Sequence, residues 1–180
     1  LGGERREITV LFADIRGFTT MSEGYKDKPE ELTVLLNDLL TPLTHEIMDQ
    51  KGTIDKYMGD AIMAFWNAPV DVPNHPRIGC EAAIKMMIAL EVLNRELIGS
   101  GRISEPLKIG IGLNTGEVTV GNLGSEQRFD YSCLGDAINL GSRLEGLSKA
   151  YGVPIVIGES TYNVLDEPPS DAEVVLLDHV

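Results

Sequence analysis

Two aspartates stand where their carboxylates could meet. Asp14 follows the apolar run of residues 8–13 and precedes Gly17, which lets backbone N–H groups approach an anion closely. Asp60 lies between two strand-like runs, residues 53–58 and 61–66, at the expected tip of a hairpin. Carboxylates that converge from adjacent strands bind Mg²⁺ or Mn²⁺, the usual cations of phosphate chemistry. Both residues also have a purely structural interpretation, Asp14 as a turn residue paired with Arg16 and Asp60 as an ordinary turn residue.

A third polar group is expected on a helix. Asn139 and Arg143 are four residues apart, so a helix places both side chains on one face. An amide and a guanidinium presented together can hold a ribose and a phosphate that is being transferred. The structural alternative is a surface helix on which Arg143 and Glu145 only face water.

The elements that must position these residues follow from apolar periodicity. The segment Asn114-Thr115-Gly116 is expected to turn the chain between two strands. Because hairpins join several neighbouring strands, we predict an α+β sandwich, a largely antiparallel sheet with helices on one face. The predicted strands cover residues 8–13, 53–58, 61–66, 107–113, 118–120, 129–134 and 153–157, the predicted helices cover residues 32–48, 76–98, 138–144 and 160–165, and an apolar segment over 172–177 follows.

Length and composition exclude several classes of protein. The 180 residues suit a single domain over 1–180, and 28 acidic against 15 basic residues give a formal charge of −13. This charge argues against nucleic acid and anionic lipid as partners. Cys80 and Cys133 have apolar neighbours and fit buried thiols of a reducing compartment, the scattered histidines argue against zinc, and no apolar run reaches the roughly 18 residues of a membrane span. We expect a cytoplasmic domain and, because the sequence begins at Leu1, a fragment of a longer protein.

Four segments, in this order, resemble the catalytic domain of class III adenylyl and guanylyl cyclases. Four collinear motifs are far more specific than any one of them. The resemblance implies the class III nucleotidyl cyclase fold, a ferredoxin-like βαββαβ core extended by further strands and helices. It also implies an enzyme of intracellular signalling that converts ATP to 3′,5′-cyclic AMP and pyrophosphate. The segments are Phe-Ala-Asp-Ile-Arg-Gly-Phe-Thr (12–19), Asp-Lys-Tyr-Met-Gly-Asp-Ala-Ile-Met-Ala-Phe-Trp (55–66), Gly-Ile-Gly-Leu-Asn-Thr-Gly (110–116) and Gly-Asp-Ala-Ile-Asn-Leu-Gly-Ser-Arg-Leu-Glu (135–145).

The resemblance assigns roles to single residues. Asp14, Asp60 and the carbonyl of Ile15 would bind two Mg²⁺ or Mn²⁺ ions, which activate the ribose 3′-hydroxyl for in-line attack on the α-phosphorus and neutralise the triphosphate. Asn139 would orient the ribose, and Arg143 would stabilise charge on the α-phosphate in the transition state. The outer phosphates would be held by the backbone amides of a loop, with one more distant arginine as a further contact: Arg16, Gly17, Phe18, Thr19 and Arg128.

The choice of base depends on Lys56 and Ser132. By resemblance Lys56 is the purine-binding lysine, whose ammonium has only donors and suits the N1 acceptor of adenine; guanylyl cyclases of the family typically carry glutamate there. Ser132 stands where many adenylyl cyclases have aspartate, and its hydroxyl can donate as well as accept, so it discriminates weakly. Asp130, on the same face of an ideal strand, is the alternative contact. Family members with threonine or serine at this position include some that respond to bicarbonate, which makes bicarbonate a candidate activator.

The resemblance also implies a second copy of the chain. Lys56 and Asp60 flank one hairpin, yet the family assigns them to different active sites, because each site lies between two chains. A two-fold homodimer would then carry two equivalent sites, and the monomer would be inactive. The family's phosphate-binding lysine belongs to a hairpin beyond Val180, so we expect slow turnover from this sequence. Two alternatives stay open: a guanylate cyclase, and a catalytically silent module that binds nucleotide or dimerises.

Overall fold

Strand β1 is the centre of a six-stranded sheet in the computed structural model, which describes residues 3–125, 127–165, 167–169 and 172–178. Two helices separate β1 from a tight hairpin, and a long helix leads from that hairpin to the longest strand. The elements in chain order are β1 (Glu4–Ile15), α1 (Phe18–Glu23), α2 (Pro29–Asp49), β2 (Thr53–Met58), β3 (Ala61–Trp66), α3 (His75–Gly99), β4 (Ile109–Gly124), β5 (Phe129–Leu134), α4 (Asp136–Tyr151), β6 (Ile155–Ile157) and α5 (Glu159–Asn163).

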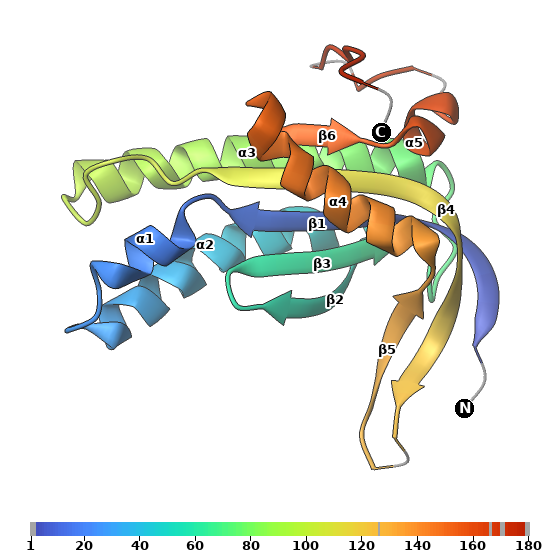
Figure 1. Ribbon diagram of the computed structural model, residues 1–180, viewed down its shortest axis with the longest axis horizontal. Coiled ribbons are helices and arrows are strands. Elements are labelled where there is room, and N and C mark those ends of the chain that lie inside the picture. Colours follow the sequence, from blue (N-terminus) through green and yellow to red (C-terminus); the bar gives the residue numbers. More distant parts are fainter. Residues whose placement is uncertain (1–2, 126, 166, 170–171, 179–180) are drawn as a thin grey trace.

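The sheet has the predicted ferredoxin-like core. Its strand order is β2-β3-β1-β4-β5, and β6 pairs with β4. The β4–β6 pair is parallel, and the other pairs are antiparallel. Reading β1, α2, β2, β3, α3 and β4 in sequence gives the βαββαβ unit, with β4 and β5 extending as a bent arm (Figure 1). The predicted α+β class is confirmed, and the predicted hairpin of residues 53–66 has the observed bounds.

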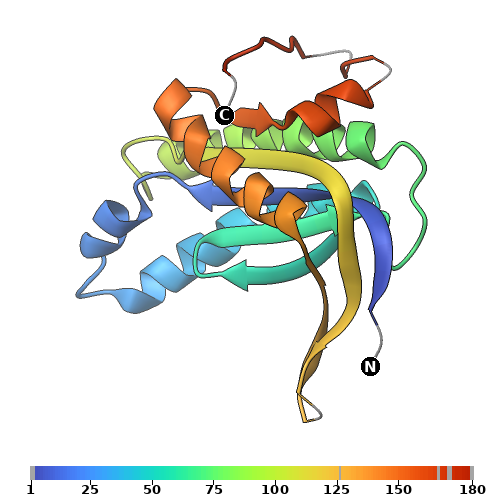
Figure 2. The ribbon, with the colours of Figure 1, turned by 45° about the vertical axis from the view of Figure 1, so that its right-hand side comes forward.

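Helices cover both faces of this sheet, so the prediction of helices on one face is wrong. On one face, Leu11 and Ala13 of β1 pack in a core with residues of α2 and α3. On the other face, Val10 and Phe12 lie beneath α4, which crosses the sheet on the side opposite to α2 (Figures 1 and 2). The physical reason is that β1 is apolar at successive positions, so each face of the strand needs its own cover.

Two glycines allow α4 to lie directly on the sheet. A Cβ atom at Gly112 of β4 would stand 2.2 Å from the backbone nitrogen of Glu145, and one at Gly141 of α4 would stand 2.8 Å from Cγ1 of Val10. Backbone cannot give way as a flexible side chain can, so a methyl group at Gly112 would push α4 off β4. The Gly-Ile-Gly motif of residues 110–112 is therefore a helix-docking surface.

Strand β4 is continuous where the sequence predicts a turn at residues 114–116. Asn114 pairs with Val10 in the register of β1 and β4. Its amide donates to the carbonyl of Ala137 at 3.0 Å and accepts from the Ser160 hydroxyl at 2.8 Å. The predicted turn is wrong because helices that follow later in the sequence satisfy the polar side chain inside the sheet.

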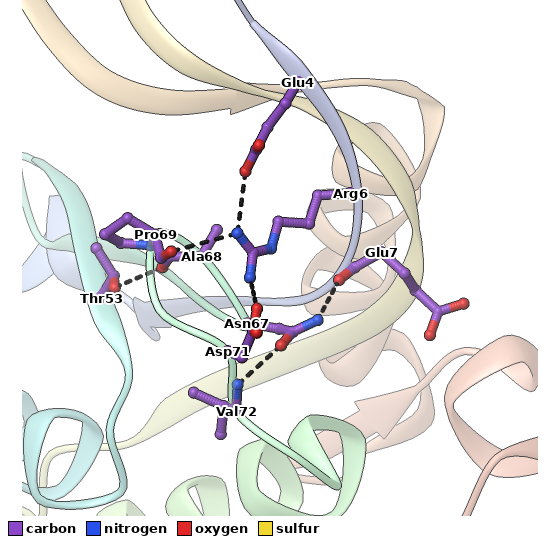
Figure 3. Close-up of polar contacts among 9 residues, drawn as sticks. All are labelled: Glu4, Arg6, Glu7, Thr53, Asn67, Ala68, Pro69, Asp71 and Val72. Carbon is purple, nitrogen blue, oxygen red and sulfur yellow. Dashed lines mark hydrogen bonds and ion pairs between the residues drawn. The ribbon is translucent and has the colours of Figure 1, made fainter.

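The loop after β3 fastens the β2–β3 hairpin to the first half of β1 (Figure 3). The Asn67 side chain donates to the carbonyl of Glu7 at 2.9 Å and accepts from the amide of Val72 at 2.8 Å. Arg6 of β1 pairs with Asp71 of the same loop. These contacts fix the hairpin laterally, and its turn therefore has a defined place beside the end of β1.

Two further expectations concern the cysteine thiols and membrane-spanning helices. Cys80 and Cys133 are free and buried, as predicted. Within the described ranges, no helix combines the length and the apolar composition that crossing a membrane requires. Residues 172–178 form neither helix nor strand.

Candidate active site

The register of β1 and β3 brings two aspartates together. Asp14 is the penultimate residue of β1 and pairs with Ala61, the first residue of β3. Asp60 precedes Ala61 in the turn, where Gly59 has a φ of 64°, a conformation that favours glycine. The Asp60 carboxyl lies within hydrogen-bonding reach of Asp14. A strand end and a hairpin tip therefore present two carboxylates to one point.

The electrostatics of the pair are unfavourable when no cation is bound. Burial, the hydrogen bond and charge of Asp60, and the charge of Glu145 raise the pKa of Asp14 to about 7, while a backbone hydrogen bond from Ile15 opposes them. Burial also raises the pKa of Glu145, against the lowering effect of Arg16. Among the described residues, Oδ1 of Asp14 is buried and accepts no hydrogen bond. Carboxylates held together in this way need a proton or a cation.

A divalent cation fits these donors. Both are hard oxygen ligands, and a buried carboxylate oxygen without a partner is free to coordinate. The described part of the chain holds no group of three or more His, Cys, Asp or Glu residues that could bind a metal ion. Because Mg²⁺ takes six oxygens, an ion at Asp14 and Asp60 would need ligands from elsewhere, such as backbone carbonyls, water or phosphates of a bound molecule.

The loop between β1 and α1 carries the predicted phosphate contacts. Gly17 has the left-handed values φ 72° and ψ 19°, and Phe18 and Thr19 open helix α1. A Cβ atom at Gly17 would meet open space, so the glycine is needed for its dihedral angles rather than for room. The loop starts two residues after Asp14, on the same edge of the sheet.

Arg16 is predicted to contact the outer phosphates together with this loop, but both its amide and its guanidinium have other partners within the chain. Its amide donates to the carbonyl of Lys108 at 2.8 Å. Its guanidinium donates to Oγ of Ser148 at 3.1 Å and to the carbonyl of Val153 at 2.5 Å. These contacts use Arg16 to tie the end of β1 to the chain around α4, because a guanidinium offers several donors in one plane. The Arg16 amide and guanidinium therefore have partners within the chain, and the amides of Gly17, Phe18 and Thr19 stay the predicted phosphate contacts.

The predicted base contacts gather around a carboxylate that sequence inspection did not single out. Ser132 of β5 is 6% exposed, and its hydroxyl donates to Oδ2 of Asp55 at 2.5 Å. The ammonium of Lys56 lies 3.3 Å from Oδ1 of the same carboxylate. The side chain of Lys56 is 51% exposed and that of Asp55 is fully buried. Lys56 and Ser132 thus come from one chain and share one buried anion.

The other predicted residues lie apart from both groups. Asn139 and Arg143 are exposed on α4, and within the described residues neither side chain forms a hydrogen bond or an ion pair. Arg128 and Asp130 are exposed on the arm formed by β4 and β5, where Asp130 pairs with Leu123. The structure joins the metal-type carboxylates to each other, and Lys56 to Ser132, and leaves the helix pair without a partner.

Two residues of this site escaped sequence inspection. Asp55 stands beside Lys56 in a polar stretch of β2, a pattern typical of a solvent-facing ion pair. Glu145 was considered only as the neighbour of Arg143 on a surface helix. Strict alternation would place Asp55 on the face opposite to Lys56, but the register of β2 and β3 shifts between Ile54 and Lys56, so the sequence pattern does not show that the two side chains meet. No local sequence pattern predicts that α4 brings Glu145 close to the end of β1.

Comparison with known proteins supplies the family. The model described as adenylate and guanylate cyclase catalytic domain matches residues 3–178. An adenylate cyclase of Anabaena cylindrica is 42% identical over 168 residues, 92% of this chain and 32% of that protein. Adenylate cyclase 1 of Rhizobium meliloti is 36% identical over 152 residues, 84% of this chain and 22% of that protein. The chain spans about a third or less of these curated relatives.

Solved structures agree on the fold and differ in the base. The crystal structure of the adenylyl cyclase CyaB from P. aeruginosa superposes with a TM-score of 0.83 at 38% identity, covering 91% of this chain and 82% of that one. The crystal structure of the guanylyl cyclase Cya2 gives a TM-score of 0.81 at 39% identity, covering 91% and 80%. Overall similarity therefore does not separate adenine from guanine.

Proposed function

This chain belongs to the family of adenylate and guanylate cyclase catalytic domains, and we propose that it is an adenylate cyclase that converts ATP to 3′,5′-cyclic AMP and pyrophosphate. Domains of this family bind a nucleotide, use divalent metal ions and typically act as dimers. The observation that carries the proposal is the convergence of the Asp14 and Asp60 carboxylates at the end of β1, where a buried oxygen of Asp14 accepts no hydrogen bond among the described residues. Two such carboxylates support a site for the divalent cations of phosphate chemistry.

We assign two Mg²⁺ or Mn²⁺ ions to Asp14, Asp60 and the carbonyl of Ile15. The buried, unpartnered oxygen of Asp14 and the raised pKa of this residue support the assignment. Bound divalent ions supply a more acidic 3′-hydroxyl and neutralise phosphate charge. The aspartates contribute by holding fixed negative charge in a part-buried place, which costs no reorganisation during the reaction.

The remaining residues position the nucleotide. In the proposed reaction the 3′-oxygen forms a bond to the α-phosphorus while the bond from that phosphorus to the pyrophosphate oxygen breaks. Asn139 orients the ribose through its amide, and Arg143 stabilises negative charge on the α-phosphate through its planar donors. The amides of Gly17, Phe18 and Thr19 hold the outer phosphates, and Arg128 is a further candidate for these phosphates.

Lys56 and Ser132 are the proposed contacts of the adenine. A lysine ammonium donates only, so it matches N1 of adenine and opposes the N1–H of guanine. Guanylate cyclase activity is the second candidate, favoured by the likeness to Cya2. A silent nucleotide-binding module is the third, and the presence of Asp14, Asp60, Asn139 and Arg143 speaks against it.

The test compares products formed from ATP and GTP with Mn²⁺ and with Mg²⁺. We expect cyclic AMP and pyrophosphate in equal amounts from ATP, and much less cyclic GMP from GTP. A preference for GTP would establish the second candidate. No cyclic product from either nucleotide, with nucleotide binding shown by calorimetry, would establish the silent module.

A homodimer with shared sites is the proposed active form. Lys56 and Asp60 lie on one hairpin, and Asn139 and Arg143 have no partner among the described residues. These facts support sites that use Asp14 and Asp60 of one chain with Asn139 and Arg143 of the other, under two-fold symmetry.

Mixed mutants test the shared sites. Asp14→Ala and Arg143→Ala proteins should each be inactive, whereas their mixture should recover activity. Random pairing gives about half heterodimers, each with both lesions in one site and the other site intact, so about a quarter of sites should work. Sites built within one chain would each keep a lesion, and a mixture as inactive as its parents, with subunit exchange shown by labelled chains, rejects the model.

Bicarbonate is proposed as an activator on the basis of Ser132 alone, by likeness to family members with serine or threonine at that position. The measurement compares sodium bicarbonate with sodium chloride at equal ionic strength, fixed pH and excess metal ion. Equal turnover in the two salts would show that bicarbonate does not activate this chain.

A further inference from the structure

Asp55 is a charged side chain enclosed between two strands. It lies on β2, its side chain is fully buried, and Oδ1 accepts no hydrogen bond among the described residues. The Ser132 hydroxyl lies 2.5 Å from its carboxylate, the Lys56 ammonium 3.3 Å and the Cys133 sulfur 4.0 Å. Burying a carboxylate is costly unless charge and hydrogen bonds compensate it. Well-packed hydrophobic residues of similar volume would avoid the cost of burying this charge. The buried carboxylate therefore points to a role other than stabilising the fold.

The contact with Asp55 decides whether the Ser132 hydroxyl can act as a donor or as an acceptor toward a bound base. A hydroxyl has one proton, and when that proton is donated to a carboxylate, the oxygen keeps only lone pairs for any other group. Burial, followed by the charge of Asp55, raises the pKa of the Cys133 thiol to about 12, so the thiol keeps its proton and is a second, weaker donor to Oδ2 of Asp55 at 4.0 Å. A carboxylate oxygen can accept from two donors, so this contact leaves the serine hydrogen bond in place. Ser132 is therefore held as an acceptor.

We propose that Asp55 is the positioning residue that makes this chain select adenine. It fixes Ser132 as an acceptor for the 6-amino group and holds Lys56 beside it as a donor for N1. Guanine presents the opposite pair, a 6-oxo acceptor and an N1–H donor, and so meets acceptor against acceptor and donor against donor. The inference rests on the proposed base contacts and adds the element that orients them.

Asp55→Asn tests the inference by reversing one hydrogen bond. The Lys56 ammonium only donates, so it attracts the amide oxygen of asparagine and turns the amide N–H₂ toward Ser132. The serine oxygen then accepts from asparagine, and its proton is free to donate to a 6-oxo group. We measure the affinities of 3′-deoxy-ATP and 3′-deoxy-GTP by calorimetry with Mn²⁺, since neither can be cyclised.

The expected result is a wild-type preference for 3′-deoxy-ATP that falls about tenfold in Asp55→Asn, the scale of one good base contact. Ser132→Ala should lose a similar factor. Adding Asp55→Asn to it should change the ratio no further, because the amide oxygen of asparagine still faces Lys56 and the remaining effect of Asp55 acts through the missing hydroxyl. Asp49→Asn, at the exposed end of α2, is the matched control and should keep the wild-type ratio.

A second ligand covers the case in which Asp55→Asn does not fold by circular dichroism. The 3′-deoxy triphosphate of purine riboside lacks the 6-amino group. We expect the wild-type chain to bind this analogue about tenfold more weakly than 3′-deoxy-ATP. The Ser132→Ala variant should bind the two ligands with equal affinity. An unchanged penalty in Ser132→Ala overturns the inference.

The outcomes separate the two proposals. A wild-type chain that prefers 3′-deoxy-GTP, or binds neither nucleotide, overturns both the adenine assignment and the role of Asp55. A wild-type preference for adenine that a folded Asp55→Asn protein keeps in full overturns the role of Asp55 alone. Lost preference together with retained folding supports both.

Discussion

Strand β1 carries two buried polar sites five residues apart, and their partners differ completely. In the middle of the strand, the hydroxyl of Thr9 hydrogen-bonds Nδ1 of His75 at 2.8 Å and the hydroxyl of Thr115 at 2.9 Å, and Thr115 hydrogen-bonds Thr161 at 2.9 Å. Desolvation lowers the pKa of His75, which favours its neutral imidazole. We refer to Thr9, His75, Thr115 and Thr161 as the hydroxyl network.

The end of the strand shows the reverse pattern. Asp14 has a buried oxygen without a hydrogen bond among the described residues, and burial together with the carboxylates of Asp60 and Glu145 raises its pKa against the effect of one backbone hydrogen bond from Ile15. No such arrangement stabilises a fold, because like charges in a part-buried place repel each other.

A buried polar site that lacks partners within the chain marks a place where a ligand binds. A buried polar group whose hydrogen-bond partners all lie within the chain is satisfied once the chain has folded. A buried carboxylate that lacks partners, and is surrounded by its own charge, becomes stable only when something else binds. Changes at the two sites should therefore have opposite consequences for activity and stability.

The largest expected effect is on turnover, at Asp14. Asp14→Asn should lower the rate of cyclic AMP formation at least about 10³-fold, the several kcal/mol that a bound metal ion supplies. The same change should raise the melting temperature of the metal-free protein at pH 8, because it removes a repelled charge. Turnover is measured with Mn²⁺ and stability by calorimetry, with Asp49→Asn as the control. Near-normal turnover of the variant would place the metal elsewhere.

The pH dependence of stability should come next in size. Burial, Asp60 and Glu145 raise the pKa of Asp14 from its ordinary value of 3.8 to about 7 in the folded chain, so the folded chain keeps a proton that the unfolded chain has released. The corresponding stability is complete below about pH 4 and is lost as pH rises through 7. The melting temperature of Asp14→Asn should therefore exceed that of wild type most above pH 7 and least near pH 4. An equal difference at both pH values contradicts the assigned repulsion.

A change in the hydroxyl network should affect stability and spare the chemistry. Thr9→Val keeps the shape of the side chain but leaves His75 and Thr115 without one partner each. We expect the free energy of unfolding to fall by about 2 kcal/mol, measured by urea denaturation, while the ATP turnover of the folded fraction stays within about twofold of wild type. A large loss of turnover at unchanged stability would show that the two sites of β1 are coupled.

The smallest effect is expected at the end of the network. Thr161→Val removes only the bond to Thr115, which keeps Thr9 as a partner, so the free energy of unfolding should fall by about 1 kcal/mol. The comparison of Thr161→Val with Thr9→Val under the same denaturant conditions checks the order. A larger loss at Thr161 would mean that the network is anchored on α5 rather than on β1.

Much of the fold could be predicted because its signals are local. The hairpin of residues 53–66 follows from two strand-like runs around a Gly-Asp pair, and α2 and α3 follow from apolar residues at helical spacing. Four collinear motifs then indicated the cyclase family, and this resemblance implied the βαββαβ order. The turn predicted at residues 114–116 failed because side chains of α4 and α5, distant in sequence, satisfy Asn114 within β4.

Residue types along the chain define which groups are available, since carboxylate, ammonium, amide and guanidinium groups follow from residue type and their spacing identifies the family. Which of these groups share an environment depends on the tertiary structure. It placed Glu145 near Asp14, turned Arg16 toward Ser148 and Val153, and enclosed Asp55 between Lys56 and Ser132. The physical reason is that desolvation and hydrogen bonding depend on neighbours brought by strand register and helix docking, and these neighbours are far away along the chain.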